Sequence, residues 1–265
     1  MELLVCVKQV PNTNEVRIDP KTNVLIREGV ASILNPDDAN ALEAALAIKD
    51  QVPGSRVTVL SMGPPQADIL LRECLAMGAD EAVLLSAREF AGADTWATSN
   101  VLAAAIEKLG KFDIIFAGRQ AIDGDTAQVG PQIATKLDLP QVTYVEHISL
   151  DGENVIVHRA LEDGYEVIRV KMPMLLTAVK QLNTPRYMSI RGIYDAYKKQ
   201  ITVWGFDDLG IAKDQVGFDS SPTFVIRSYT PPAKGKGIVF TDDPQASVKK
   251  LTEILFAKKI LRGGE

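Results

Sequence analysis

Apolar runs of strand length alternate with helical segments through the first 118 residues, and this alternation limits the fold more than any other feature of the chain. The runs cover residues 3–7, 55–63, 80–86 and 112–118. Runs of this kind are typical of strands that are buried on both faces of a sheet. Strands that alternate with helices of about 10 to 15 residues indicate βαβ units and a parallel sheet. We therefore predict a doubly wound, Rossmann-like α/β fold.

Helix boundary signals agree with this pattern. Asn35 can cap a helix that begins at Pro36, and the acidic residues 37–38 suit the positive end of that helix. Gly78 is expected to end a helix that follows the second strand, and Asp94 is expected to cap the helix that follows the third. The segment at 12–27 is polar with scattered apolar residues, and we expect a small excursion there.

The pattern changes after residue 140. The Asp-Gly pairs at 151–152 and 163–164 stand between runs rich in β-forming residues. Such pairs are strong signals for tight hairpins, so we predict an antiparallel extension of the sheet. Residues 201–240 show little regular period, and a helix is expected at about 243–261.

These changes suggest two parts. We predict a nucleotide-binding α/β domain at 1–200, and at 201–265 an extended C-terminal arm that ends in a helix. A structureless stretch of about 40 residues is unusual within a compact domain. We therefore expect the arm and its helix to pack on a partner subunit.

Composition and charge exclude several classes of protein. The 265 residues are 46% hydrophobic and 24% charged, with a net charge of −5, which is ordinary for a globular protein. No basic run offers an electrostatic footprint for nucleic acid, so we expect no such partner. A membrane-spanning helix needs about 18 consecutive apolar residues, and no apolar run of the chain is that long. The N-terminus lacks the pattern of a signal peptide. We expect no membrane insertion and a cytoplasmic location.

The cysteines and histidines do not suggest a metal site. Cys6 and Cys74 lie far apart in the chain and form neither a metal-ligand spacing nor a disulfide framework. His147 and His158 have no cluster of Cys or Asp beside them. We expect no bound metal.

The segment AGRQAIDGDTAQVGP, residues 117–131, is the strongest candidate for a ligand site. In a doubly wound sheet, ligands bind at the carboxyl ends of the strands, where the strand order reverses. Gly118 ends a strand, and the following loop runs into a helix that starts between 125 and 131, whose free amides would attract phosphate. Asp123 and Asp125 would repel an anion, so we interpret them as acceptors for ribose hydroxyls or as a helix cap.

A plain strand-to-helix turn is the alternative for this loop. The dinucleotide fingerprint G-x-G-x-x-G and the phosphate loop G-x-x-x-x-G-K-[ST] do not occur in the chain. Their absence counts against a dehydrogenase and against an ATP-hydrolysing motor.

Five blocks of the chain together resemble the beta subunit of electron transfer flavoprotein. They are VCVKQVP, LNPDDANALEAAL, LSMGPPQADILLRECLAMGADEAVLL, AGRQAIDGDTAQVGPQIA and LNTPRY. The similarity runs in order up to about residue 200 and weakens in the arm. It implies an obligate heterodimer with an alpha subunit, which holds an FAD in a mobile C-terminal domain, while the beta subunit holds a second nucleotide.

The resemblance leaves two choices for that nucleotide. Conventional members of the family carry a structural AMP, whereas the electron-bifurcating subgroup carries a second FAD that is reduced by NADH. The motifs NPDD and DGDTAQVGP resemble the bifurcating subgroup, and conventional members tend to have an NPFC-like segment and DDDCNQTG instead. Gly124, which has no side chain, would leave room for the longer ligand. We therefore expect FAD, with AMP as the alternative.

The bifurcating subgroup implies a mechanism and partners. Hydride would pass from NADH to the beta-site FAD; one electron would then go through the alpha-subunit FAD to an acyl-CoA dehydrogenase type flavoenzyme, and the other to ferredoxin or flavodoxin. Since a flavin carries this redox chemistry, we expect no catalytic side chain here and redox activity only within the heterodimer. Two alternatives stay open: a conventional shuttle that does not react with NADH, and a stand-alone adenine-nucleotide-binding or hydrolysing protein.

The family's nucleotide site maps onto four parts of the chain. Residues 6–9 would lie beside the adenosine or pyrophosphate, residues 35–38 near the adenine, residues 62–63 along it, and residues 120–131 around the phosphates and ribose. The predicted cofactor-binding residues are Cys6, Lys8, Gln9, Asn35, Asp38, Met62, Gly63, Gly118, Gln120, Ala121, Ile122, Asp123, Gly124, Asp125, Thr126, Ala127, Gln128, Val129, Gly130 and Pro131.

Three of these residues have plain structural alternatives. Cys6 can be a small buried side chain, Lys8 a solvated surface charge, and Asn35 a helix cap only. The block LNTPRY at 182–187 matches the family's recognition loop, in which Leu182 would dock in an apolar pocket of the partner dehydrogenase.

Overall fold

The computed structural model describes residues 1–12, 31–226, 235 and 237–261. Within them, nine strands form one sheet in the order β11-β5-β4-β1-β6-β10-β7-β8-β9. The strands are β1 (Glu2–Cys6), β4 (Arg56–Met62), β5 (Glu81–Leu85), β6 (Ile114–Gly118), β7 (Gln141–Asp151), β8 (Asn154–Ala160), β9 (Tyr165–Lys171), β10 (Met174–Ala178) and β11 (Thr202–Trp204). A small antiparallel pair, β2 (Gln9–Pro11) and β3 (Ser32–Leu34), stands beside it.

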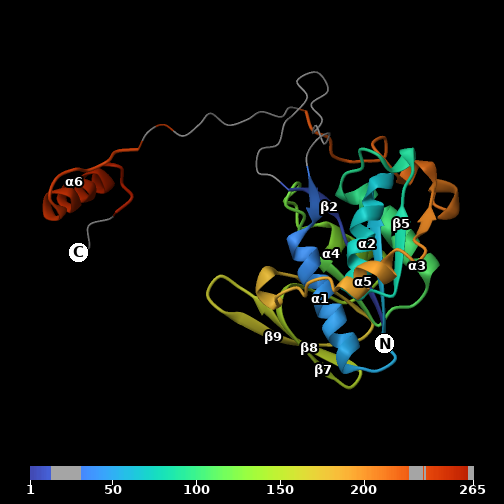
Figure 1. Cartoon of the computed structure of the whole chain (residues 1–265). Helices are drawn as coiled ribbons and strands as arrows, with labels where there is room; N and C mark the ends of the chain where they lie inside the picture. The colour runs from blue at the N-terminus through green and yellow to red at the C-terminus, as the bar shows by residue number, and fades with distance from the viewer. Residues whose placement is uncertain (13–30, 227–234, 236, 262–265) are drawn as a thin grey trace. The chain divides into compact units, whose positions relative to one another are not determined.

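The sheet is parallel from β11 to β7 and antiparallel from β7 to β9. On one side of β1 the chain adds β4, β5 and β11. On the other side it adds β6 and β10, so the strand order reverses between β1 and β6. The prediction of a doubly wound α/β sheet with an antiparallel extension is confirmed. In Figure 1 the hairpin strands β7, β8 and β9 extend from one end of the sheet.

Two layers of helices cover the parallel strands. The helices of the first unit are α1 (Pro36–Gln51), α2 (Asp68–Met77), α3 (Thr95–Leu109), α4 (Val129–Lys136) and α5 (Ile190–Ala196). One buried cluster joins α1 and α2 to the face of the sheet that includes Val5 and Phe116. A second joins α3 and α4 to the face that includes Leu4 and Ile115. Strand residues therefore alternate between two cores, as expected for a sheet that is buried on both faces.

The predicted helix ends are mostly confirmed. Gly78 ends α2 with a φ of 133°, a conformation that favours glycine. The Asp94 carboxylate caps α3 by accepting a hydrogen bond from the Ala97 amide at 3.0 Å. The excursion expected at 12–27 lies, beyond Asn12, outside the described residues.

The chain divides into two compact units, residues 1–226 and 227–265. We expected the arm to begin at residue 201, but residues 201–226 belong to the first unit. Within that stretch β11 pairs with β5, Val216 is buried, and Gly217 lies so close to Glu89 that a Cβ would stand 2.2 Å from its carbonyl oxygen. This stretch is held by a three-residue strand and by single buried residues, so its hydrophobic residues do not recur at the regular spacing that a helix or a long strand would show in the sequence.

The second unit contains α6 (Pro244–Ala257). Asp243 caps this helix, because its carboxylate accepts hydrogen bonds from the amides of Gln245 and Ala246 at 3.0 and 3.2 Å. Val248 and Phe256 are exposed in the described part of the chain. The helix has apolar side chains that its own unit does not bury.

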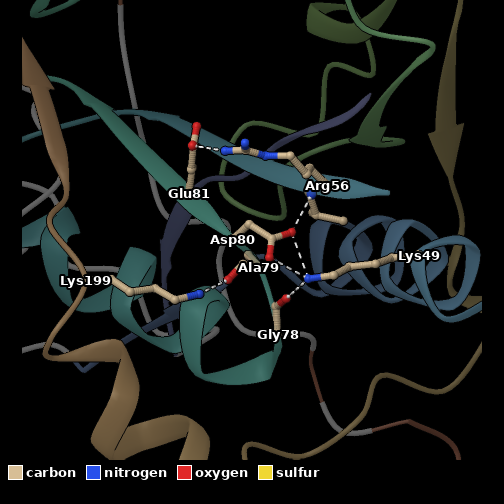
Figure 2. Close-up of polar contacts among 8 residues, drawn as sticks. Lys49, Arg56, Gly78, Ala79, Asp80, Glu81 and Lys199 are labelled. Atoms are coloured by element: carbon tan, nitrogen blue, oxygen red, sulfur yellow. Dashed lines mark hydrogen bonds and ion pairs between the residues drawn. The ribbon is translucent and has the colours of Figure 1, made fainter. Parts of the chain in front are cut away.

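An ionic cluster fastens α1 to the amino ends of β4 and β5 (Figure 2). Both oxygens of Asp80 accept hydrogen bonds from Lys49 Nζ at 2.7 Å, and one also accepts the Val57 amide at 2.8 Å. Lys199 Nζ donates to the carbonyl of Ala79 at 2.7 Å, which brings the segment after α5 to the same corner. The pair of Arg56 and Glu81 lies nearby and is exposed.

Replacement of Asp80 by alanine should destabilise the protein by about 1–3 kcal/mol. The substitution leaves the Val57 amide and the Lys49 ammonium without their acceptor in a partly buried corner. Glu81→Ala is the matched control and should cost less than about 1 kcal/mol, since exposed ion pairs contribute little. Urea unfolding of both variants measures this difference, and equal losses would contradict it.

Candidate functional site

The candidate site lies at the carboxyl ends of β1 and β6, where the strand order reverses. Asp38, in the first turn of α1, joins these two ends. Its Oδ2 accepts a hydrogen bond from the Lys8 amide at 2.8 Å, and its Oδ1 accepts one from the Gly118 amide at 3.0 Å. A Cβ at residue 118 would stand 2.3 Å from Asp38 Oδ1, so this close approach requires glycine.

Burial changes the protonation of this site. Desolvation raises the pKa of Asp38 to about 7, although the Asn35 side chain, the two amides and the charge of Lys8 favour the carboxylate. Burial, together with the charge of Asp38, raises the pKa of the Cys6 thiol to about 12. Cys6 is therefore a protonated, buried side chain at neutral pH, in keeping with a packing role.

Asn35 does not cap α1 with its side chain, contrary to the structural alternative considered for it. Its Nδ2 donates to the carbonyl of Gln120 at 2.8 Å, and its Oδ1 accepts from the Ile122 amide at 3.1 Å. The side chain is fully buried. The Asn35 side chain thus forms hydrogen bonds with the loop after β6 and holds this loop against the start of α1.

The two aspartates of this loop are held by neighbouring side chains. Lys8 Nζ lies 2.7 Å from an oxygen of Asp123, so the lysine neutralises that carboxylate. Asp125 accepts a hydrogen bond from the Gln120 side chain. The interpretation of these aspartates as a helix cap is wrong, because α4 begins at Val129 and has Gln128 at its cap position. Their role as ribose acceptors stays a prediction.

The loop presents a row of peptide N–H groups. The amides of residues 126–130 donate to no acceptor among the residues that the structure describes. Asp125 and Ala127 each have a φ of 53°, a left-handed conformation that changes the direction of the chain before α4. N–H groups that lead into a helix N-terminus suit an anionic group such as a phosphate.

Gly130 allows α4 to start close to the sheet. A Cβ there would stand 2.7 Å from the Thr177 methyl group of β10, so a larger residue would push the loop away from the strand ends. At Gly124 a Cβ would meet no atom within 4 Å. The chain itself does not require glycine at that position, and room for a ligand stays a prediction.

The structure brings together only part of the predicted set. Hydrogen bonds connect two groups of residues, one of Lys8, Asp38, Gly118 and Asp123 and the other of Asn35, Gln120, Ile122 and Asp125. The Asn35 amide, which donates to the Lys8 carbonyl at 3.0 Å, joins them into one network. Gln9 lies in the small sheet opposite Leu34, and Met62 packs against the core at the end of β4. Gly63 is fixed through its amide, which donates to the carbonyl of Leu85 at 3.0 Å.

Sequence reasoning missed Arg119, which follows Gly118 directly. Its Nε lies 3.4 Å from Asp37 Oδ2, and its guanidinium stands 5.7 Å from the centre of the Tyr144 ring. Burial raises the pKa of the Asp37 carboxyl, and the charge of Arg119 opposes this rise. A charged residue at a strand end next to the crevice was the available signal.

Two cavities formed by described residues lie away from this network. One, of about 480 Å³, lies between α3 and residues 209–215. The other, of about 360 Å³, is lined by β7, Arg159 and Ile168 and touches the predicted site only at Pro131. The polar groups at the strand ends therefore carry the argument for a ligand site, and a closed cavity does not.

The LNTPRY segment is anchored rather than free. Leu182 packs against the core in a half-buried position, and its contact with a partner stays a prediction. Arg186 forms hydrogen bonds with both carboxylate oxygens of Glu43 at 2.8 and 2.9 Å and with Asp50 at 2.8 Å. The next residues are exposed, with Tyr187 98% and Ile190 90% accessible.

Comparisons with known proteins place the chain among related sequences. A family profile described as the electron transfer flavoprotein domain matches residues 22–209. The chain is 65% identical over 241 residues to the caffeyl-CoA reductase-Etf complex subunit CarD of Acetobacterium woodii, covering 91% of this chain and 92% of that protein. It is 58% identical over 262 residues to electron transfer flavoprotein subunit beta of Thermoanaerobacterium thermosaccharolyticum, covering 98% and 100%.

A third relative carries a different name. It is the acryloyl-CoA reductase electron transfer subunit gamma of Anaerotignum propionicum, 48% identical over 269 residues, with 98% of this chain and 100% of that protein covered. None of the helices in the described part of the chain is long and apolar enough to cross a membrane.

Titration of Asp38 should make stability depend on pH. Its folded pKa of about 7 lies above the ordinary aspartate pKa of 3.8, so between these two pH values the native protein holds a proton that the unfolded chain releases. The free energy of unfolding should therefore fall as pH rises from 4 to 7, by up to about 1.4 kcal/mol per pH unit. Asp38→Asn should remove this slope in urea unfolding across that range. Parallel pH profiles for the two proteins would contradict the assignment.

Proposed function

The chain belongs to the electron transfer flavoprotein family as a beta subunit, and from this premise we propose that it binds an FAD at the carboxyl ends of β1 and β6. The observation that carries the proposal is the row of amides at residues 126–130, which have no acceptor among the described residues. A diphosphate would supply oxygens to these N–H groups. Lys8 removes the repulsion that Asp123 would otherwise exert.

The chain's own residues would bind and orient the coenzyme. Asn35 holds the loop against α1, and Asp38 sets the spacing of β1 and β6 through the two backbone amides. A bound flavin would accept hydride from NADH and release the electrons separately, one towards ferredoxin or flavodoxin and one through the alpha-subunit FAD. Because Cys6 stays protonated, no thiolate from this site takes part.

Support for the bifurcating subgroup comes from motifs and from relatives. The motifs NPDD and DGDTAQVGP are the ones that resemble that subgroup. Two relatives bear names of CoA-ester reductase systems, caffeyl-CoA reductase and acryloyl-CoA reductase. We therefore propose an acyl-CoA dehydrogenase type flavoenzyme as the downstream partner. A conventional subunit with AMP is the second candidate, since the same amides would bind one phosphate.

We also propose an alpha subunit as an obligate partner in the cytoplasm. The exposed apolar side chains of α6, among them Val248 and Phe256, would pack against that subunit together with the C-terminal unit as a whole. The name of the Acetobacterium relative identifies it as one subunit of a complex. The exposed apolar side chains of α6 favour a protein with a partner subunit over a stand-alone nucleotide-hydrolysing protein.

The downstream flavoenzyme would dock on the surface formed by Tyr187, Ile190 and Tyr194. These side chains are exposed and follow the anchored segment that resembles the recognition loop. Leu182 stays the expected contact, and we propose Ile190, which is far more exposed, as a further anchor beside it. Arg186 and its partners Glu43 and Asp50 fix the base of this surface.

The flavin content of the co-purified heterodimer tests the cofactor. We expect two FAD molecules per heterodimer after heat release, no AMP, and bleaching of flavin absorbance by NADH under anaerobic conditions. One FAD with one AMP, and no reaction with NADH, would identify the conventional type. Isolation of a stable monomer that hydrolyses ATP would overturn both assignments.

Replacement of Ile190 by aspartate should weaken docking of the downstream flavoenzyme. A buried interface anchor contributes about 2 kcal/mol or more, so kcat/KM for reduction of that partner should fall about 30-fold or more. Flavin content and the reaction with NADH should not change. Val167→Asp, at another exposed apolar residue, on β9, is the control and should leave kcat/KM intact. An unchanged KM in the Ile190 variant would remove this surface from the proposal.

A further inference from the structure

We infer that Arg119 binds a negatively charged oxygen of the coenzyme, an inference that rests on the proposed function and adds a residue to that site. Arg119 is the first residue after β6 and the last before the loop that carries the free amides. Three observations support this role: a fixed backbone, an unsatisfied guanidinium, and an aromatic support beneath it.

The backbone of Arg119 is fixed at the carboxyl edge of the sheet. Its amide donates to the carbonyl of Ala178, the last residue of β10, at 2.8 Å. Tyr144 belongs to β7 at the same level, because its neighbour Val145 pairs with Ala178. The side chain therefore starts from a rigid position at the carboxyl ends of β6 and β10, beside Tyr144 in the first half of β7.

The guanidinium lacks hydrogen-bond acceptors within the described chain. Its Nε is buried and has no hydrogen-bond partner there, and the side chain as a whole is only 34% exposed. Asp37 lies 3.4 Å from Nε, which is an ion pair without hydrogen-bond geometry. A buried N–H group without an acceptor is costly, so an acceptor from outside the described chain is expected to complete Nε.

Tyr144 supports the guanidinium from an unusual backbone conformation. Its φ is 58°, in the left-handed region that bulky residues rarely adopt, and its amide donates to Thr177 Oγ1 at 3.2 Å. The centre of the ring lies 5.7 Å from the guanidinium carbon. Strained backbone of this kind is typical of functional sites, and a planar cation held on a ring keeps its N–H edges directed outwards.

The ligand chemistry that fits is an anionic oxygen, which guanidinium groups bind through paired N–H donors. In an adenine coenzyme this oxygen can come from the phosphates or from the reduced flavin ring. Phosphate contact would strengthen binding of every phosphorylated form. Contact with the ring would favour the reduced flavin and leave nucleotides without a flavin unaffected.

The test uses the co-purified heterodimer after its nucleotides are removed, with FAD and ADP as probes. Arg119→Gln removes the charge, and Arg119→Lys keeps the charge but loses the planar fork. Arg56→Gln is the matched control, since Arg56 forms an exposed pair with Glu81 at the amino edge of the sheet (Figure 2). Calorimetric affinities and the midpoint potential of the beta-site flavin are measured for each protein, and urea unfolding checks that each variant is folded.

If Arg119 contacts a phosphate, the Arg119→Gln variant should bind both FAD and ADP at least tenfold more weakly, and Arg119→Lys should recover part of this affinity.

If Arg119 contacts the flavin ring, Arg119→Gln should bind ADP as the wild type does, and the midpoint potential of its beta-site flavin should be lower. The potential should fall by about 30 mV for each tenfold loss of preference for the two-electron reduced flavin. Unchanged affinities and potential in both Arg119 variants would overturn the inference. If the wild-type complex holds AMP and takes up no second flavin, the proposed function fails instead, and the ADP measurement still decides the role of Arg119.

Discussion

Asp38 connects the two central strands at the one place where a doubly wound sheet opens. Where the strand order reverses, the helices that follow two adjacent parallel strands lie on opposite faces of the sheet, and a crevice opens at the carboxyl ends of these strands. The backbone amides at that edge then need an acceptor from elsewhere in the chain. The Asp38 carboxylate, carried in by α1, accepts the amides of both Lys8 and Gly118. Glycine at 118 is the steric condition for this approach. The position of α1 relative to the loop after β6 depends on this junction.

The loop after β6 is built on that junction. Once Asp38 sets the distance between α1 and Gly118, Asn35 at the start of the same helix reaches the backbone of the loop and accepts one of its amides. Lys8 reaches Asp123 from the other strand. Side chains from the segment after β1, from α1 and from the loop therefore satisfy one another, while the amides of residues 126–130 have no acceptor among the described residues. A site that is prepared for a ligand has this distribution of used and unused donors.

Much of this arrangement could be predicted from the sequence, because periodicity and helix caps act locally. Apolar runs and capping residues such as Asp94 predicted the parallel sheet and its helices, and two Asp-Gly pairs predicted the hairpins. Long-range contacts decided the rest. Asn35 has the identity of a cap, but two loop groups compete for its side chain. Leu182 matches a recognition motif, yet it packs on the core, and the three residues of β11 are too few to show a period.

The two edges of the sheet differ in how far the chain satisfies its own charged and polar groups. At the amino edge Asp80 combines with Lys49 and with the Val57 amide, so charges and donors are satisfied within the chain. At the carboxyl edge Arg119 stays without a hydrogen-bond acceptor among the described residues, although it is two-thirds buried. Both edges use the same residue types, so composition cannot distinguish them. The difference is that the Asp80 carboxylate is matched by donors of the chain itself, whereas the buried Nε of Arg119 has no hydrogen-bond acceptor among the described residues.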